Sequence, residues 1–141
     1  MLISEKQKQI VEEFSRYDRW EDRYKHIIEI GKTLKPLDEK LKTEDNRIKG
    51  CQSITYLYAK LDGDKILYTA DSDAMIVKGL ATLLIQVYSD HTPKEILETS
   101  ADFLTEMGLT THLSQSRSNG LAAMVRQFKN YAIAFQTLLG K

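Results

Sequence analysis

Apolar residues recur at helical spacing in the first part of the chain. They predict an amphipathic helix over residues 4–16, where Ser4 is the expected N-cap and Gln7 completes a capping box. The same periodicity predicts a second helix over residues 20–34. Pro36 cannot continue this helix because its ring removes a backbone donor.

The middle of the chain has the composition of β-strands. Residues 54–61 and 66–69 are rich in β-branched and aromatic side chains, and Asp62-Gly63-Asp64 between them is typical of a tight turn. This pattern predicts an antiparallel hairpin. A short strand at Arg47-Ile48 would extend it to a sheet of about three strands.

The pattern becomes strongly apolar after the hairpin. Residues 74–88 carry apolar side chains around most of the helical circumference, which predicts a helix buried at the centre of the fold. Asp71, Ser72 and Asp73 precede this helix and are expected to cap it. Together these elements predict an α+β fold in which several helices pack against a small antiparallel sheet.

The remaining segments are predicted to be mostly helical. Thr92 and Pro93 are typical of an N-cap and a first helical position, which predicts a short helix through Leu97. A second short helix is expected over residues 101–107. Residues 108–118 are expected to form a polar loop, and residues 119–139 a final amphipathic helix.

Length and charge narrow the class of protein. The 141 residues suit one domain covering residues 1–141, and 20 basic residues balance 20 acidic ones, which argues against nucleic-acid binding. Charges at Glu5, Lys6 and Lys8 interrupt any signal-peptide core. No apolar stretch approaches the ~20 residues that span a bilayer. We therefore expect a cytoplasmic protein that does not enter a membrane.

Cys51 is the only cysteine, so it cannot form an internal disulfide or a cysteine-rich metal site. It follows Gly50, which permits an unusual backbone angle or a close neighbour. Arg47 and Lys49 are either solvated charges or cations that favour the nucleophilic thiolate. These residues alone leave open whether Cys51 is a buried apolar filler or a reactive group.

Three further residues are candidates for a site, each with a structural alternative. His112 is either a base for Cys51 or a loop histidine with a structural hydrogen bond. Arg117 either binds an anion or partner carboxylate, or ties down its loop. Asp73 is first of all a helix cap. The three histidines, of which His26 and His91 are the others, are widely separated, so no metal site is predicted.

Four segments in this order resemble the SufE family of cysteine desulfuration proteins, and they span nearly the whole chain. They are Trp20-Glu21-Asp22-Arg23-Tyr24 with Ile27, Ile28 and Gly31; Asn46-Arg47-Ile48-Lys49-Gly50-Cys51-Gln52-Ser53; Asp71-Ser72-Asp73-Ala74 with Ile76-Val77-Lys78-Gly79-Leu80; and His112-Leu113-Ser114 with Ser116-Arg117-Ser118-Asn119-Gly120-Leu121 and Met124. Two departures are Tyr56, where the family often has tryptophan, and Gln115, where proline is frequent. They bear on partner preference more than on the nucleophile.

The resemblance implies a SufE/IscU-like fold and a sulfur-transfer role. Cys51 would accept sulfur as a persulfide from a SufS-like cysteine desulfurase, stimulate that enzyme, and pass the sulfur to a SufBCD-like iron–sulfur scaffold. The pyridoxal phosphate (PLP) would belong to the desulfurase, so this chain would need no cofactor of its own. By the same resemblance, the residues that support the Cys51 loop are Arg47, Gly50 and Gln52, and those that contact the partner or position the loop are Asp73, His112 and Arg117.

Several expectations follow for such a carrier. With no second cysteine, the persulfide sulfur must leave to another molecule. Cys51 should be sheltered beside Ile48 and Ile54 and become exposed on docking. The chain would act as an accessory protein rather than a stand-alone enzyme. The alternatives are an allosteric adaptor that carries no sulfur and a self-sufficient Cys–His enzyme using His112, and homodimerisation is left open.

Overall fold

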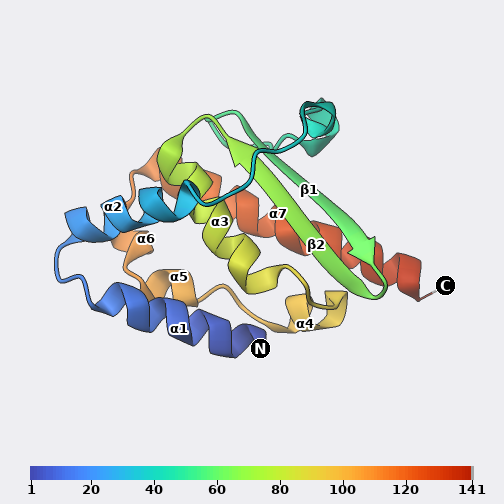
Figure 1. The fold of residues 1–141 in the computed structure, drawn as a ribbon, viewed down its shortest axis with the longest axis horizontal. Coiled ribbons are helices and arrows are strands. Elements are labelled where there is room, and N and C mark those ends of the chain that lie inside the picture. The colour runs from blue at the N-terminus through green and yellow to red at the C-terminus, as the bar shows by residue number, and fades with distance from the viewer. Residues whose placement is uncertain (141) are drawn as a thin grey trace.

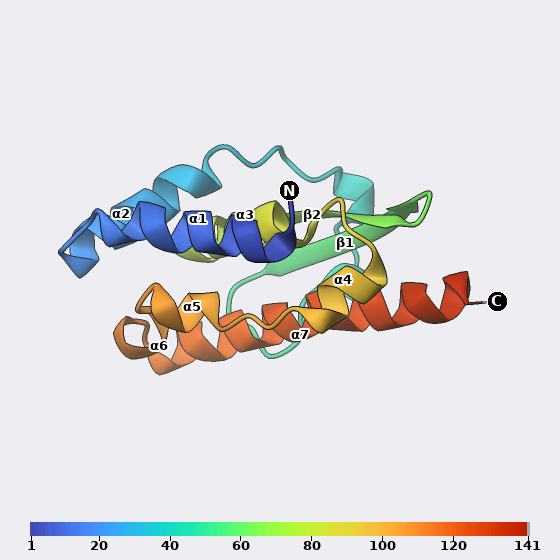
Figure 2. The ribbon, with the colours of Figure 1, turned by 90° about the horizontal axis from the view of Figure 1, so that it is seen from below.

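The computed structural model describes residues 1–140 and confirms an α+β fold. Figure 2 shows α1, α2 and α3 on one side of the molecule and α4 to α7 on the other. The helices are α1 (Ile3–Ser15), α2 (Trp20–Gly31), α3 (Met75–Tyr88), α4 (Pro93–Glu98), α5 (Phe103–Glu106), α6 (Leu109–His112) and α7 (Gln115–Leu139), with 3-10 turns η1 (Glu39–Leu41) and η2 (Glu44–Asn46). The strands are β1 (Thr55–Asp62) and β2 (Lys65–Ser72), which lie beside α3 and α7 (Figure 1).

The sheet has two antiparallel strands in the part of the chain that the structure describes, not the expected three. The register runs from Thr55 opposite Ser72 to Asp62 opposite Lys65. The segment at Arg47 forms a single bridge to Tyr56. Pairing stops there because the chain turns away at Gly50, whose φ of 84° ends the extended conformation.

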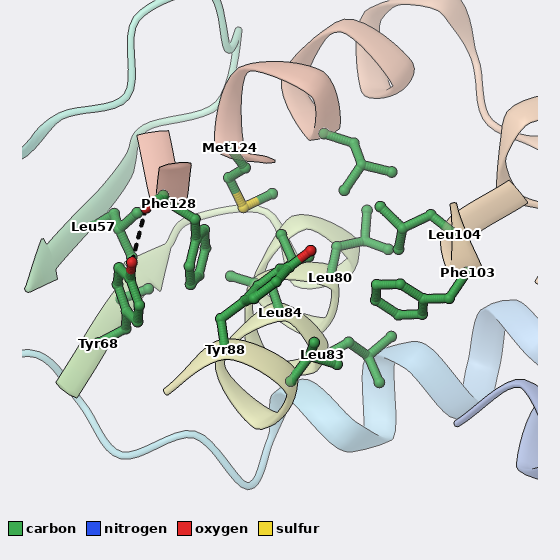
Figure 3. Close-up of a cluster of buried hydrophobic side chains, with 14 of the residues drawn as sticks. Leu57, Tyr68, Leu80, Leu83, Leu84, Tyr88, Phe103, Leu104, Met124 and Phe128 are labelled. Carbon is green, nitrogen blue, oxygen red and sulfur yellow. Dashed lines mark hydrogen bonds between the residues drawn. The ribbon is translucent and has the colours of Figure 1, made fainter. Parts of the chain in front are cut away.

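Helix α3 is the buried centre of the fold, as its sequence predicts. Ten of its residues are buried, and its side chains meet those of α5, α7 and the sheet in one cluster (Figure 3). The Tyr68 hydroxyl donates a hydrogen bond of 2.8 Å to the Phe128 carbonyl oxygen, which links β2 to α7. The apolar cluster and this bond fix the sheet against α7, the helix that carries Arg117.

Two glycines allow α2 and α3 to cross at close range. A Cβ atom on Gly79 would overlap the Ile27 carbonyl oxygen, and one on Gly31 would lie 2.8 Å from the Gly79 backbone nitrogen. Both positions therefore require glycine for steric reasons. The crossing anchors the amino-terminal layer to the central helix.

The helix boundaries differ from the predicted ones at the amino-terminal end. Helix α1 begins at Ile3, and Ser4 does not cap it; instead the Glu5 carboxylate accepts a hydrogen bond of 3.1 Å from the Leu2 backbone nitrogen. Helix α2 ends at Gly31 instead of Leu34. The chain continues in turns, in which the backbone N–H groups of residues 33 and 34 donate to carbonyl oxygens three residues earlier instead of four, as in an α-helix.

The predicted polar loop over residues 108–118 is wrong, because it contains α6 and the first turn of α7. Helix α7 begins at Gln115, where the Ser114 hydroxyl accepts a hydrogen bond of 3.3 Å from the Arg117 backbone nitrogen. Because the residues of this first turn are polar, the spacing of apolar residues does not reveal it. The Thr92 cap and Pro93 start of α4 are confirmed. No helix within residues 1–140 is long and apolar enough to cross a membrane.

Candidate functional site

Cys51 follows the turn that separates the Arg47 bridge from β1. Gly50, with its positive φ, turns the chain so that the Cys51 side chain lies against α7. A Cβ atom on Gly120 would lie 3.1 Å from the Cys51 sulfur, so the absence of a side chain there makes room for the thiol. The Cys51 thiol is free and half-buried.

A pocket of about 340 Å³ opens beside this thiol. Arg117 brings its positive charge to the pocket from the first turn of α7. Its lining residues come from three segments: Cys51, Gln52 and Ser53; Ala74 and Val77; and Ser114, Ser116, Arg117 and Gly120. The pocket therefore joins a nucleophilic thiol to a cation and several hydroxyl groups.

Gln52 fastens the Cys51 loop to α7. The Ser116 hydroxyl donates a hydrogen bond of 2.8 Å to the Gln52 side-chain carbonyl oxygen. On the other side of the thiol, the Ser53 hydroxyl lies 3.0 Å from the sulfur and the Thr55 hydroxyl 3.7 Å from it. Polar groups as well as apolar ones thus surround Cys51.

The apolar side chains that line the pocket beside Cys51 are those of Ala74 and Val77, and the two isoleucines expected to shelter the thiol are not among them. Ile48 is buried, but Ile54 is 43% exposed. Ile54 is held by its backbone: its nitrogen donates to the Asp73 carboxylate at 2.9 Å, and the Asp73 nitrogen donates to the Ile54 carbonyl oxygen at 3.1 Å. The expected helix cap at residues 71–73 is wrong, since Ala74 is the N-cap of α3 and no side chain caps the helix. Asp73 instead ties the start of β1 to the loop before α3.

Arg47 and Lys49 do not line the thiol pocket. Both pair with Glu44, at 3.7 Å and 2.7 Å respectively. Lys49 is the main cause of the lowered pKa of the Glu44 carboxyl, with a smaller contribution from Arg47. Arg117 is therefore the pocket's cation, in place of the two basic residues that precede Cys51 in the sequence.

His112 makes no hydrogen bond to Cys51 in the described residues and does not line the pocket. Its ring stacks on Trp20, with centroids 4.7 Å apart and planes inclined by 11°. Nearby, Arg23 donates to the carbonyl oxygens of Tyr17 and Met107. These contacts hold α2 to the segment that leads into α7. They give His112 a place in positioning that segment, and no hydrogen bond joins its ring to the Cys51 sulfur in the described residues.

Local sequence patterns do not mark the residues that contact the sulfur. Gly120 lies within one of the segments quoted above but carried no individual signal, and nothing in the pattern marked Ser53 or Thr55 as neighbours of the thiol. Within residues 1–140 no cluster of three or more His, Cys, Asp and Glu side chains is arranged to hold a metal ion. The arrangement suits nucleophilic sulfur chemistry at Cys51.

A family model described as "SufE: Fe-S metabolism associated domain" matches residues 8–132. The chain belongs to the SufE family. It is 42% identical over 127 residues to an uncharacterised SufE-like protein of Synechocystis, covering 90% of this chain and 80% of that protein. An uncharacterised SufE-like protein of Rhizobium meliloti is 37% identical over 129 residues, covering 88% and 92%. Membership in the family places the chain in iron–sulfur metabolism.

The fold is also similar to that of a solved protein. The solution structure of a hypothetical protein from Thermus thermophilus superposes with a TM-score of 0.77 at 25% identity, covering 94% of this chain and 96% of the other. The likeness therefore extends over nearly the whole of both chains.

Proposed function

We propose that this SufE-family chain is a sulfur carrier that receives persulfide sulfur on Cys51 from a PLP-dependent cysteine desulfurase. The observation that carries the proposal is the placement of the single thiol in a pocket that also holds Arg117. The pocket leaves space next to the sulfur for one more sulfur atom. The desulfurase's own PLP would release the sulfur, and this chain would hold and deliver it.

The transfer step balances without an oxidant or a reductant. The Cys51 thiolate attacks the outer sulfur of the donor's cysteine persulfide, forming a new S–S bond. The donor's S–S bond breaks, and its cysteine leaves as a thiolate. Cys51 then holds the persulfide, and because the chain has no other cysteine, the sulfur leaves only to another molecule. We propose that this acceptor is a SufBCD-like scaffold for iron–sulfur cluster assembly.

The position of Arg117 supports a role in transfer over a role in stability. Arg117 lies in the first turn of α7, where a cation opposes the helix dipole. No carboxylate within residues 1–140 lies within 4 Å of its guanidinium. An unpaired cation in an unfavourable position beside a thiol suits attraction of an anionic persulfide or of a partner carboxylate.

The main alternative function is that of an allosteric adaptor, which would also bind a desulfurase but would carry no sulfur. The two are separated by measuring desulfurase turnover with the wild-type chain and with Cys51→Ser. If the chain is a carrier, Cys51→Ser should not stimulate desulfurase turnover, because no thiol then removes the sulfur from the enzyme-bound persulfide. Full stimulation by Cys51→Ser would establish the adaptor and overturn the carrier.

The Cys–His enzyme has little support, because His112 stacks on Trp20 and does not line the pocket.

A further inference from the structure

A continuous chain of hydroxyl groups runs from the Cys51 sulfur into the protein. The Ser53 hydroxyl oxygen lies 3.0 Å from the sulfur, and it lies 2.9 Å from the Thr55 hydroxyl oxygen. The Thr55 oxygen is in turn 2.9 Å from the Ser72 hydroxyl oxygen. All three distances are those of hydrogen bonds.

The sheet holds this chain in place. Thr55 and Ser72 are directly opposite each other at one end of the hairpin, and Thr55 is fully buried. A buried hydroxyl needs a partner within the protein, since an unsatisfied one is destabilising. Here the partners of Thr55 are the two serine hydroxyls and the Cys51 sulfur, which lies 3.7 Å away.

The backbone at the inner end is compatible with hydrogen bonds that all point toward the sulfur. The Ala74 nitrogen donates to the Ser72 hydroxyl oxygen at 3.2 Å, and an N–H group can only donate. A thiolate can only accept, so when Cys51 is ionised Ser53 donates to the sulfur, Thr55 donates to Ser53 and Ser72 donates to Thr55, each with its single proton. The last proton in the series then points at the Cys51 sulfur.

We propose that the hydroxyls of Ser53, Thr55 and Ser72 form a directed donor chain that stabilises the Cys51 thiolate as the sulfur-accepting nucleophile. This inference rests on the proposed carrier function. Hydrogen bonds to a charged acceptor favour the charged form, and bonds in series strengthen one another. Ionisation releases the thiol proton to water in the adjoining pocket, and every hydroxyl keeps its own proton. Ser53 touches the reacting sulfur directly, while Ser72 acts only through Thr55.

Several charged groups also lie around the loop, and none of them is changed in the variants that test the proposal. Arg117 approaches the thiol from α7 by way of the pocket. The Asp73 carboxylate, from the segment before α3, accepts the Ile54 backbone hydrogen bond. Arg47 and Lys49 on the Cys51 side both pair with Glu44. A change in the pH profile that follows removal of one hydroxyl therefore reports on the hydroxyl chain.

The test measures the rate at which iodoacetamide alkylates Cys51 in the free protein across neutral and alkaline pH. Thr55→Val removes the central hydroxyl and preserves the side-chain shape, whereas Thr55→Ser retains the hydroxyl. We expect Thr55→Val to react about tenfold more slowly near neutral pH, because one donor of the series to the sulfur is missing. At high pH its rate should equal or exceed that of the wild type, because the thiolate is then fully formed. Thr55→Ser should follow the wild-type profile.

Ser53→Ala provides a second variant at a less buried position, and it should be slowed near neutral pH in the same way. Unchanged pH profiles in both Thr55→Val and Ser53→Ala would overturn the donor chain. A rate changed equally at every pH would also overturn it, since that indicates altered access to the thiol. Failure of the carrier function is a separate result: the wild type would then take up no sulfur, whatever the alkylation profiles show.

Discussion

The sulfur of Cys51 lies against Gly120, close enough that a Cβ atom on the glycine would be 3.1 Å from it. This contact joins the turn after Gly50 to the second turn of α7, far away in the sequence. Because residue 120 has no side chain, it leaves space beside the Cys51 sulfur that an added sulfur atom can use. Substitutions at position 120 therefore test the site without removing any chemical group.

Gly120→Ala should lower sulfur uptake while leaving the fold intact. Alanine is favoured over glycine within a helix by about 1 kcal/mol, so the free energy of unfolding should stay level or rise. The new methyl group would nevertheless displace the Cys51 sulfur, and we expect persulfide formation to slow at least about fivefold. Urea unfolding and a timed sulfur-transfer assay measure the two effects. Ser118→Ala is the control, because residue 118 does not line the pocket. Wild-type uptake in Gly120→Ala would contradict the importance of this contact.

Arg117→Ala should slow sulfur transfer from the desulfurase by about tenfold, and Arg117→Lys by less, since lysine keeps the charge but not the planar guanidinium. The free energy of unfolding should change by less than about 0.5 kcal/mol, because Arg117 has no ion-pair partner within residues 1–140. Single-turnover transfer and urea unfolding provide the two readouts. Unchanged transfer in Arg117→Ala would remove Arg117 from the site.

Gly79→Ala should destabilise the fold by about 3 kcal/mol, because its methyl group would overlap the Ile27 carbonyl oxygen and force α2 away from α3. Gln86→Ala, at an exposed position on the same helix, should change stability by less than about 0.5 kcal/mol. Urea unfolding monitored by circular dichroism compares the two. Equal stability of both variants would show that α2 and α3 do not cross at this distance.

Asp71 should contribute to stability in a pH-dependent way. Burial alone would raise its pKa, but the Ser72 backbone N–H together with Lys42 and Lys78 holds the pKa of this carboxyl below its usual value. A lowered pKa in the folded state gives stability that is present above the unfolded-state pKa of about 3.9 and is lost as the pH falls through the folded-state pKa. Asp71→Asn should therefore be less stable than the wild type by about 1 kcal/mol at neutral pH.

The stability difference between the wild type and Asp71→Asn should shrink toward zero below about pH 3. Thermal unfolding followed across this range gives the difference directly. Asp64→Asn, in the exposed hairpin turn, is the control and should show no comparable difference. A gap between wild type and Asp71→Asn that stays constant with pH would exclude an ionised Asp71 as its source.

The sequence predicted the elements whose apolar pattern is strong. The buried helix α3, the hairpin and the Thr92-Pro93 start of α4 were all foreseen, because burial and turn chemistry leave local signatures. The start of α7 was placed too late, because its first turn is polar and is defined by the Ser114 cap. The expected third strand does not form. The segment at Arg47 has the composition of a strand, but it makes a single bridge because the chain turns at Gly50.

The site was only partly predictable. Cys51, Gln52 and Arg117 do meet at one pocket, whereas His112 stacks on Trp20 and the two cations before Cys51 pair with Glu44. Gly120 and Thr55 reach the sulfur through tertiary contacts between segments distant from each other in the sequence or through strand geometry. Local patterns cannot report such contacts, so these residues became visible only in the folded chain.

Intact-mass spectrometry of the chain after incubation with an active cysteine desulfurase and cysteine tests the carrier function most directly. We predict that the wild-type protein gains the mass of one sulfur atom, that a thiol reductant removes it, and that Cys51→Ser gains none. Ser53→Ala keeps the cysteine and should still gain the sulfur, more slowly. An unchanged wild-type mass while the desulfurase turns over cysteine would contradict the proposal that Cys51 carries sulfur.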